Sequence, residues 1–259
     1  MCLIVFSFRD LPSYPLILAG NRDEFYQRPT KQAHVWDTDP EFVAGKDLEA
    51  GGTWLGISQN GEFGAVTNYR NLYEPVKGDK SRGAIIPEFL TSDQSIRERI
   101  HSIEKQKNNF SGFNLIAGSA EKLFYVSNQS KSAKEISPGL HGISNAFLDT
   151  SWPKVELAKK EFKTSIQSGE IDREAVFELL QQSDPFPKEQ LPDTGLSPEM
   201  ERAVSPAFIK TADYGTRCSS LLTIDRNNRV QFIERTFNPG SGVVTSKVSF
   251  SFKIGNTIT

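Results

Sequence analysis

The chain has 259 residues, and we expect one domain spanning residues 1–259 because layered folds often reach this size as one unit. Its 30 Lys and Arg residues against 32 Asp and Glu residues give a formal net charge of −2. This balance argues against a general nucleic-acid binder, which usually carries a large basic excess. No apolar run reaches the roughly 18 residues of a membrane helix, so we expect no stable membrane insertion.

Two cysteines cannot build a disulfide framework, and such sparse use is typical of a reducing compartment. The first ten residues are apolar but soon meet charge and have no basic segment before them. They therefore predict a strand and not a signal peptide, and the expected location is cytoplasmic.

Strand-like runs come mainly in pairs along the chain. Asn60-Gly61 separates two of them and is the strongest short-range signal for a hairpin. The expected strands span residues 2–8, 15–19, 54–58, 63–69, 113–117, 123–127, 219–224, 230–234 and 248–252. Several hairpins favour antiparallel sheets over a doubly wound parallel sheet.

Helical patterns lie between these pairs, at residues 81–90, 92–105, 153–167 and 172–182. The second should begin at a Ser92 or Asp93 cap, and the third has Pro153 in its first turn. Residues 186–206 hold several prolines and predict an irregular segment. Paired strands with helices in separate blocks indicate an α+β layered sandwich.

Cys2 is the first residue that could carry chemistry. Removal of Met1 would leave its thiol beside a free α-amine, whose pKa near 7.7–8.0 suits a general base at neutral pH. A cysteine with its own base is an activated nucleophile. The alternative is that Cys2 is a small buried residue that opens a strand.

The run Asn21-Arg22-Asp23-Glu24 directly follows the second expected strand. If the first two strands pair, the end of the second lies near Cys2, within reach of Arg22 or Asp23. A guanidinium stabilises a thiolate and a carboxylate can hold an ammonium group. The alternative is a polar turn, in which Glu24 pairs with Arg22 or Arg28.

These motifs together resemble one family. Cys2, the run at 21–24 and Gly51-Gly52-Thr53-Trp54-Leu55-Gly56 look like the NRDE family, also called the transport and Golgi organisation protein 2 family. The resemblance continues to residue 219 through the motifs Thr67-Asn68-Tyr69-Arg70, Ser144-Asn145, Trp152-Pro153-Lys154 and Thr216-Arg217-Cys218-Ser219.

That family is similar to the N-terminal nucleophile hydrolases, closest to choloylglycine hydrolase and penicillin V acylase. The resemblance implies a four-layer αββα sandwich with mainly antiparallel sheets. It also implies a role for each catalytic position. Cys2 would be the nucleophile, Arg22 would polarise the thiol and Asp23 would orient the α-amine. Asn68 and Asn145 would form the oxyanion hole. Arg217 would correspond to the later active-site arginine of those enzymes.

Four further residues are expected to contact the substrate: Asn21, Glu24, Trp54 and Tyr69. The chain departs from the hydrolases in one motif, because they have Gly-Arg-Asn-x-Asp where this chain has Gly-Asn-Arg-Asp. The arginine and asparagine are transposed, and the aspartate is one residue closer.

Other kinds of site find little support in the sequence. The three histidines, His34, His101 and His141, lie far apart, so no metal spacing is present and no cofactor is expected. Cys218 is more typical of a core position than of a ligand.

The favoured function is therefore hydrolysis of a non-peptide carbon–nitrogen bond in a small amide or acyl compound. Relatives in the NRDE family are linked to lipid and haem handling. The alternative is accordingly a non-catalytic carrier of a lipid or haem-type ligand, or a trafficking protein, on the same scaffold.

Overall fold

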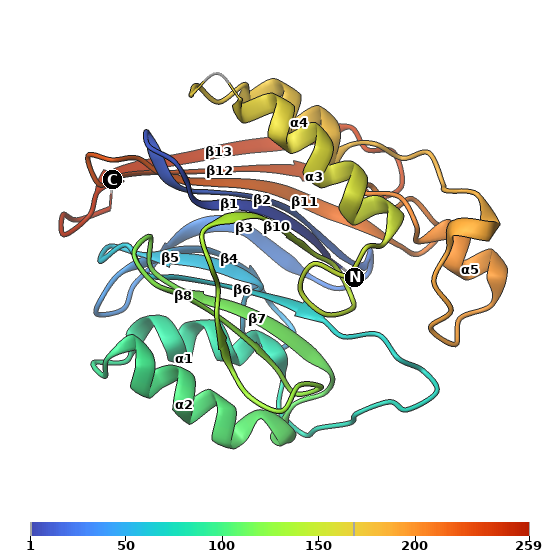
Figure 1. Cartoon of the computed structure of the whole chain (residues 1–259), viewed down its shortest axis with the longest axis horizontal. Coiled ribbons are helices and arrows are strands. Elements are labelled where there is room, and N and C mark those ends of the chain that lie inside the picture. Colours follow the sequence, from blue (N-terminus) through green and yellow to red (C-terminus); the bar gives the residue numbers. More distant parts are fainter. Residues whose placement is uncertain (1, 168, 259) are drawn as a thin grey trace.

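The computed structural model describes residues 2–167 and 169–258, which form two antiparallel sheets stacked face to face (Figure 1). The six-stranded sheet contains, in spatial order, β10 (Gly139–Ile143), β1 (Cys2–Leu11), β2 (Tyr14–Phe25), β11 (Tyr214–Ile224), β12 (Arg229–Phe237) and β13 (Val244–Lys253). The seven-stranded sheet contains β3 (Thr30–Trp36), β4 (Phe42–Asp47), β5 (Leu55–Ser58), β6 (Phe63–Asn68), β7 (Phe113–Gly118), β8 (Leu123–Ser127) and β9 (Lys134–Glu135).

Helices cover the outer face of each sheet (Figure 1). The seven-stranded sheet is covered by α1 (Ile85–Thr91) and α2 (Ile96–Gln106), and the six-stranded sheet by α3 (Pro153–Ile166) and α4 (Arg173–Leu180). A short α5 (Pro198–Ala203) lies in the segment that precedes β11. The predicted αββα sandwich is thus confirmed.

The side chains of β1 show why this strand lies at the centre. Ile4 and Phe6 pack into the core between the sheets, whereas Leu3 and Val5 pack into the core under α3 and α4. A strand buried on both faces is a nearly continuous apolar run, and this is what the sequence shows. Cys2 continues the face of Ile4 and therefore points between the sheets at the start of the strand.

Two expectations about elements were wrong. Helix α2 is capped by Ser95, which forms a capping box with Glu98, and not by Ser92 or Asp93. The helix expected at 81–90 begins at Ile85, after a short 3₁₀ turn over Arg82–Ala84.

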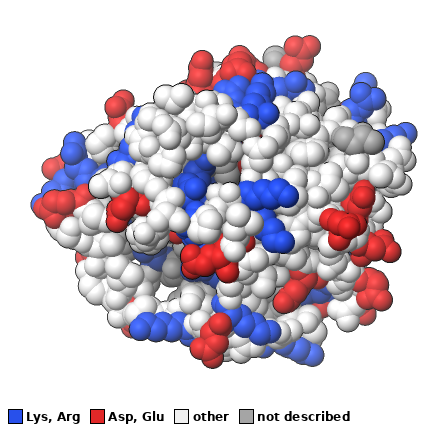
Figure 2. All heavy atoms as spheres, turned by 180° about the vertical axis from the view of Figure 1, so that it is seen from behind, with Lys and Arg blue, Asp and Glu red and all other residues white. Residues whose placement is uncertain are grey.

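Several elements were not predicted from the sequence, namely β3, β4, β9, β10 and α5. Strand β10 contains two glycines, which are depleted in strands, and β3 lies at a sheet edge with an irregular register. None of the helices in the described residues is long and apolar enough to cross a membrane. Acidic and basic side chains are interspersed over the face seen in Figure 2, consistent with the small net charge.

Candidate active site

A cavity of about 160 Å³ opens between the sheets beside the first residue of β1. Seven of the ten predicted site residues line it, although they are scattered over more than 200 positions of the chain: Cys2, Arg22, Asp23, Glu24, Trp54, Asn68 and Arg217. The fold therefore gathers most of the predicted constellation in one place.

Sheet register places Cys2 next to Arg22. The two residues are directly opposed in the β1–β2 pair, and Cys218 opposes Arg22 from the other side on β11. The Cys2 side chain is only 7% exposed. Burial raises the pKa of the Cys2 thiol, and the nearby Asp23 carboxylate acts in the same direction. The thiol is therefore protonated at neutral pH, and attack on a carbonyl requires a base.

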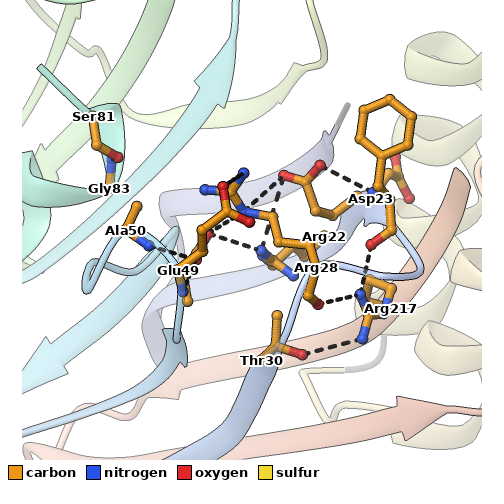
Figure 3. A network of polar contacts seen from close by, with 12 residues as sticks. Arg22, Asp23, Arg28, Thr30, Glu49, Ala50, Ser81, Gly83 and Arg217 are labelled. Carbon is orange, nitrogen blue, oxygen red and sulfur yellow. Dashed lines mark hydrogen bonds and ion pairs between the residues drawn. The ribbon is translucent and has the colours of Figure 1, made fainter. Parts of the chain in front are cut away.

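Arg22 belongs to a network of charged side chains (Figure 3). Its Nη2 lies 3.4 Å from Asp47 Oδ2 and 4.0 Å from Glu24 Oε2. Arg28 Nε donates to the same Asp47 oxygen over 2.7 Å and lies 3.9 Å from Glu24. Burial opposes the charge on Asp47, but the backbone N–H of Ala50 and the Arg28 guanidinium hold its pKa below the usual range. The positive charge of Arg22 is thus shared with two carboxylates.

Asp23 is a buried carboxyl at the cavity wall. Its Oδ1 accepts a hydrogen bond of 2.7 Å from Thr216 Oγ1, and its backbone carbonyl accepts one from the Tyr214 hydroxyl. Burial raises the pKa of Asp23 from 3.8 to about 6, although the buried Lys154 favours the charged form. Met1, and with it the state of the N-terminus, lies outside the described residues.

Arg217 reaches the cavity because β11 has a bulge between Thr216 and Cys218. A bulge adds an unpaired residue and re-aims its side chain. The Arg217 guanidinium donates to the carbonyls of Phe25 and Arg28 over 2.8 and 2.9 Å and lies 3.3 Å from Thr30 Oγ1 (Figure 3). Arg217 therefore ties the chain that follows β2 to the cavity wall.

The two asparagines predicted for the oxyanion hole differ in position. Asn68, at the end of β6, lines the cavity, whereas Asn145 lies buried behind it. Asn145 Nδ2 donates to the Asn68 carbonyl over 2.9 Å, and its Oδ1 accepts from Ser144 Oγ. Ser144 Oγ also lies 2.9 Å from the Cys2 carbonyl. In this structure, Asn145 holds the backbone around the site and does not face the cavity.

Two of the expected substrate-binding residues also lie elsewhere. Asn21 points to the opposite face of the sheet, where its Nδ2 donates to the carbonyls of Leu180 and Ala207 over 2.8 Å. Successive strand residues alternate faces, so Asn21 and Arg22 cannot both face the cavity. Tyr69 lines a neighbouring cleft, with its ring 5.0 Å from that of Phe147.

This second cleft has a volume of about 650 Å³ and mostly apolar walls. It lies between the chain that follows β6 and the chain around α5, and its apolar side chains include Leu72, Val76, Leu196, Met200 and Val204. Two residues, Asn68 and Arg82, line both this cleft and the cysteine cavity. A molecule bound at Cys2 therefore has an apolar surface beside it.

The sequence analysis missed several residues of the cavity wall. Asp47 joins the two arginines, and Arg82 lies at the border with the apolar cleft. Glu234 is buried, and its Oε1 accepts a 2.7 Å bond from the Ala33 N–H of the other sheet. Burial raises the pKa of Glu234. Asp47 lies shortly before Gly51-Gly52. A carboxylate at the start of this glycine turn is the sequence signal by which Asp47 could have been found.

Across residues 2–167 and 169–258, the structure brings together no group of three His, Cys, Asp or Glu side chains suited to a metal ion. The polar groups of the cavity are guanidinium, ammonium, amide, hydroxyl, carboxyl and thiol groups. Such a set is suited to acyl chemistry at sulfur and to binding an anion.

Asp23→Asn is expected to stabilise the fold increasingly as pH rises. A carboxyl whose folded pKa is raised costs nothing below its ordinary pKa of 3.8 and costs the full amount above about 6. With about 1.4 kcal/mol for each pKa unit, the variant should gain about 2–3 kcal/mol at pH 7 and little at pH 4. Urea unfolding followed by circular dichroism at several pH values measures the difference.

Asn retains an oxygen that can accept the bond from Thr216, so this variant removes the charge and keeps that hydrogen bond. The exposed Asp10 is the matched control, and Asp10→Asn should change stability by no more than about 0.5 kcal/mol at any pH. A gain from Asp23→Asn that does not vary with pH would contradict the expected ionisation.

Comparison with solved structures identifies the fold. The chain is similar to a Caenorhabditis elegans orthologue of N-acylethanolamine-hydrolyzing acid amidase, with a TM-score of 0.51 and 11% identity. The match covers 85% of this chain and 92% of the amidase chain. The chain therefore shares its αββα sandwich fold with this amidase.

Sequence relatives extend over most of the chain. It is 36% identical over 259 residues to the Bos taurus transport and Golgi organization protein 2 homolog, covering 91% of this chain and 93% of the relative. It is 31% identical to the Drosophila melanogaster transport and Golgi organization protein 2, with 91% and 92% covered. The family model described as transport and Golgi organisation 2 matches residues 1–239. The chain thus belongs to the transport and Golgi organisation 2 family.

Proposed function

We propose that the chain is an N-terminal cysteine hydrolase that cleaves a non-peptide carbon–nitrogen bond. The observation that carries this proposal is the convergence of Cys2, Arg22, Asp23 and Asn68 on one cavity from three different strands. A core cysteine requires no such polar surroundings. The fold shared with an amidase adds support.

The reaction would begin once removal of Met1 frees the α-amine of Cys2. This amine takes the thiol proton, and the sulfur attacks the amide carbon to form a carbon–sulfur bond. Asn68 stabilises the oxyanion, a contribution of roughly 3–4 kcal/mol for one donor. The ammonium then protonates the leaving nitrogen as the carbon–nitrogen bond breaks. Water hydrolyses the thioester, releases the carboxylic acid and restores the thiol.

Labelling of the two cysteines tests this activation. Burial raises the pKa of Cys218 well above its ordinary value, and Glu234 adds to the effect. Cys2 would have its own amine as base, so iodoacetamide should label Cys2 at least about tenfold faster than Cys218 at neutral pH, as peptide mass spectrometry would show. Intact mass should show loss of Met1.

A Cys218→Ser protein is the control and should be labelled at Cys2 at the same rate. Equally slow labelling of both thiols, or uniform retention of Met1, would contradict an activated nucleophile. Retention of Met1 would favour the alternative function described next.

A second function is favoured by the apolar cleft. It is larger than the cysteine cavity, about 650 against 160 Å³, and Leu72 and Met200 are exposed in its walls. A carrier of a lipid or haem-type ligand would use this surface without covalent chemistry. The names of the relatives concern transport and Golgi organisation, which accords with a trafficking role.

A further inference from the structure

Arg82 lies at the border between the cysteine cavity and the apolar cleft, and it lines both. It begins the 3₁₀ turn Arg82–Ala84, whose start is capped by Ser81 Oγ accepting from the Gly83 N–H. The charged side chain therefore comes from a short, hydrogen-bonded turn at the junction of the two spaces.

The Gly51-Gly52-Thr53 motif holds this turn in place. A Cβ atom on Gly52 would lie 2.3 Å from the carbonyl carbon and oxygen of Gly83, so the two backbones meet where any side chain at position 52 would clash. The Thr53 N–H donates to the Gly83 carbonyl over 3.0 Å. The motif thus fixes the position of the residue next to Gly83, which is Arg82.

Several other buried or partly buried arginines face a carboxylate, and the partly buried Arg217 donates to two backbone carbonyls. Arg99 lies 2.6 Å from Glu62, Arg70 lies 2.9 Å from Glu201 and Arg28 lies 2.7 Å from Asp47. These ion pairs neutralise charges that are withdrawn from water.

Arg82 differs from them. Within the described ranges its one hydrogen bond runs from Nη1 to the Gly112 carbonyl over 3.1 Å, and it forms no ion pair. Burial lowers the pKa of Arg82. A partly buried guanidinium without a counter-ion is costly, and an anion bound against it would recover part of that cost.

The surroundings indicate what kind of molecule carries the anion. A free inorganic anion would not explain the apolar side chains Leu72, Val76 and Met200, which line the same cleft as Arg82. A compound with an apolar chain and a carboxylate matches both the apolar cleft and the Arg82 guanidinium. The planar guanidinium fork matches a carboxylate in a bidentate arrangement.

We propose that Arg82 binds a carboxylate of the substrate. The substrate is then an amide that joins an apolar acyl chain to a carboxylate-bearing amine, as in an N-acyl amino acid. The chain lies in the apolar cleft, and the amide carbon lies near Cys2 and Asn68. This inference rests on the proposed function for the position of the amide and adds the class of substrate.

Binding to a Cys2→Ala protein tests the proposal without turnover. Isothermal titration calorimetry compares N-dodecanoylglycine with N-dodecanoylethanolamine, which has the same acyl chain and a neutral hydroxymethyl group in place of the carboxylate. In this background, Arg82→Met should lower the affinity for N-dodecanoylglycine by about tenfold to a hundredfold, which is the range expected for a charge-assisted pair. The affinity for N-dodecanoylethanolamine should change by less than about threefold. Arg82→Lys should restore part of the lost affinity for N-dodecanoylglycine.

Arg97→Met is the matched control, because the Arg97 side chain is 70% exposed on α2. This variant should change the affinity for neither compound. Equal weakening of both probes by Arg82→Met would overturn the proposal, since Arg82 would then only shape the wall. Unchanged binding of N-dodecanoylglycine, its failure to bind the Cys2→Ala protein at all, or equal affinity for sodium acetate would overturn it too. Failure of hydrolysis in the parent protein would instead remove the proposed function and leave the binding result intact.

Discussion

Replacing Cys2 by alanine is expected to abolish hydrolysis and the formation of a covalent acyl adduct. Removing a catalytic nucleophile from a hydrolase costs several orders of magnitude in rate, and we expect a loss of at least about 10³-fold. The measurement uses dodecanoyl p-nitroanilide as the amide, with release of nitroaniline followed by absorbance. Intact mass spectrometry would detect the thioester in the parent protein after rapid quenching.

Cys218→Ser is the internal control, because Cys218 lines the same cavity but has no α-amine of its own. It should retain most of the rate. The same experiment separates the two candidate functions. Under the hydrolase function Cys2→Ala removes turnover and keeps affinity for N-dodecanoylglycine. Under the carrier function the parent protein shows saturable binding with no turnover, and Cys2→Ala changes neither.

Replacing Glu62 by alanine is expected to cost about 3–5 kcal/mol of folding stability, the largest effect we expect from a single substitution outside the cavity. Arg99 is buried, and its two terminal nitrogens lie 2.6 and 2.7 Å from the two Glu62 oxygens. Arg99 Nη1 also donates to the Phe89 carbonyl. The variant leaves a buried guanidinium without its carboxylate, which is the costly state of a broken buried pair.

Urea unfolding followed by tryptophan fluorescence measures this loss. The exposed pair of Arg97 and Glu135 is the matched control, because its atoms are 3.9 Å apart and the side chains are 70% and 55% exposed. Glu135→Ala should change stability by less than about 1 kcal/mol. If Glu62→Ala cost no more than Glu135→Ala, the buried pair would contribute nothing that a surface pair does not.

The hairpins and the central strand were predictable from the sequence, because their signals are local. Asn60-Gly61 marks a turn between two apolar runs, and the continuous apolar run of β1 indicates burial on both faces. The neighbourhood of Cys2 and Arg22 also followed from sequence order, since a hairpin brings the end of its second strand to the start of its first. The order of the motifs allowed the family to be recognised.

Elements with weak local signals escaped prediction. Strand β10 contains Gly139 and Gly142, and it exists because β1 offers it an antiparallel partner. Strand β3 is irregular between Lys31 and His34 and lies at the edge of its sheet. Pairing with a strand far away in the chain stabilises both, and no property of a short segment shows such pairing.

The composition of the cavity wall was decided by the tertiary structure. Successive residues of a strand face opposite sides of the sheet, so Asn21 points away from Cys2 while Arg22 faces it. The bulge in β11 brings Arg217 to the cavity wall. Asn145 lies one layer behind Asn68 because a buried amide satisfies its hydrogen bonds with the nearest backbone.

The sequence by itself determined which residue types could carry acyl chemistry and where the first hairpin would place two of them. Only the packing of the two sheets decided that Asp47 joins Arg22 to Arg28. It also decided that Arg82, which forms no ion pair within residues 2–167 and 169–258, lies beside the apolar cleft. The physical reason is that each of these contacts joins separate elements of the chain. Their free energy depends on the distance and burial that the whole fold imposes, and residue type alone determines neither.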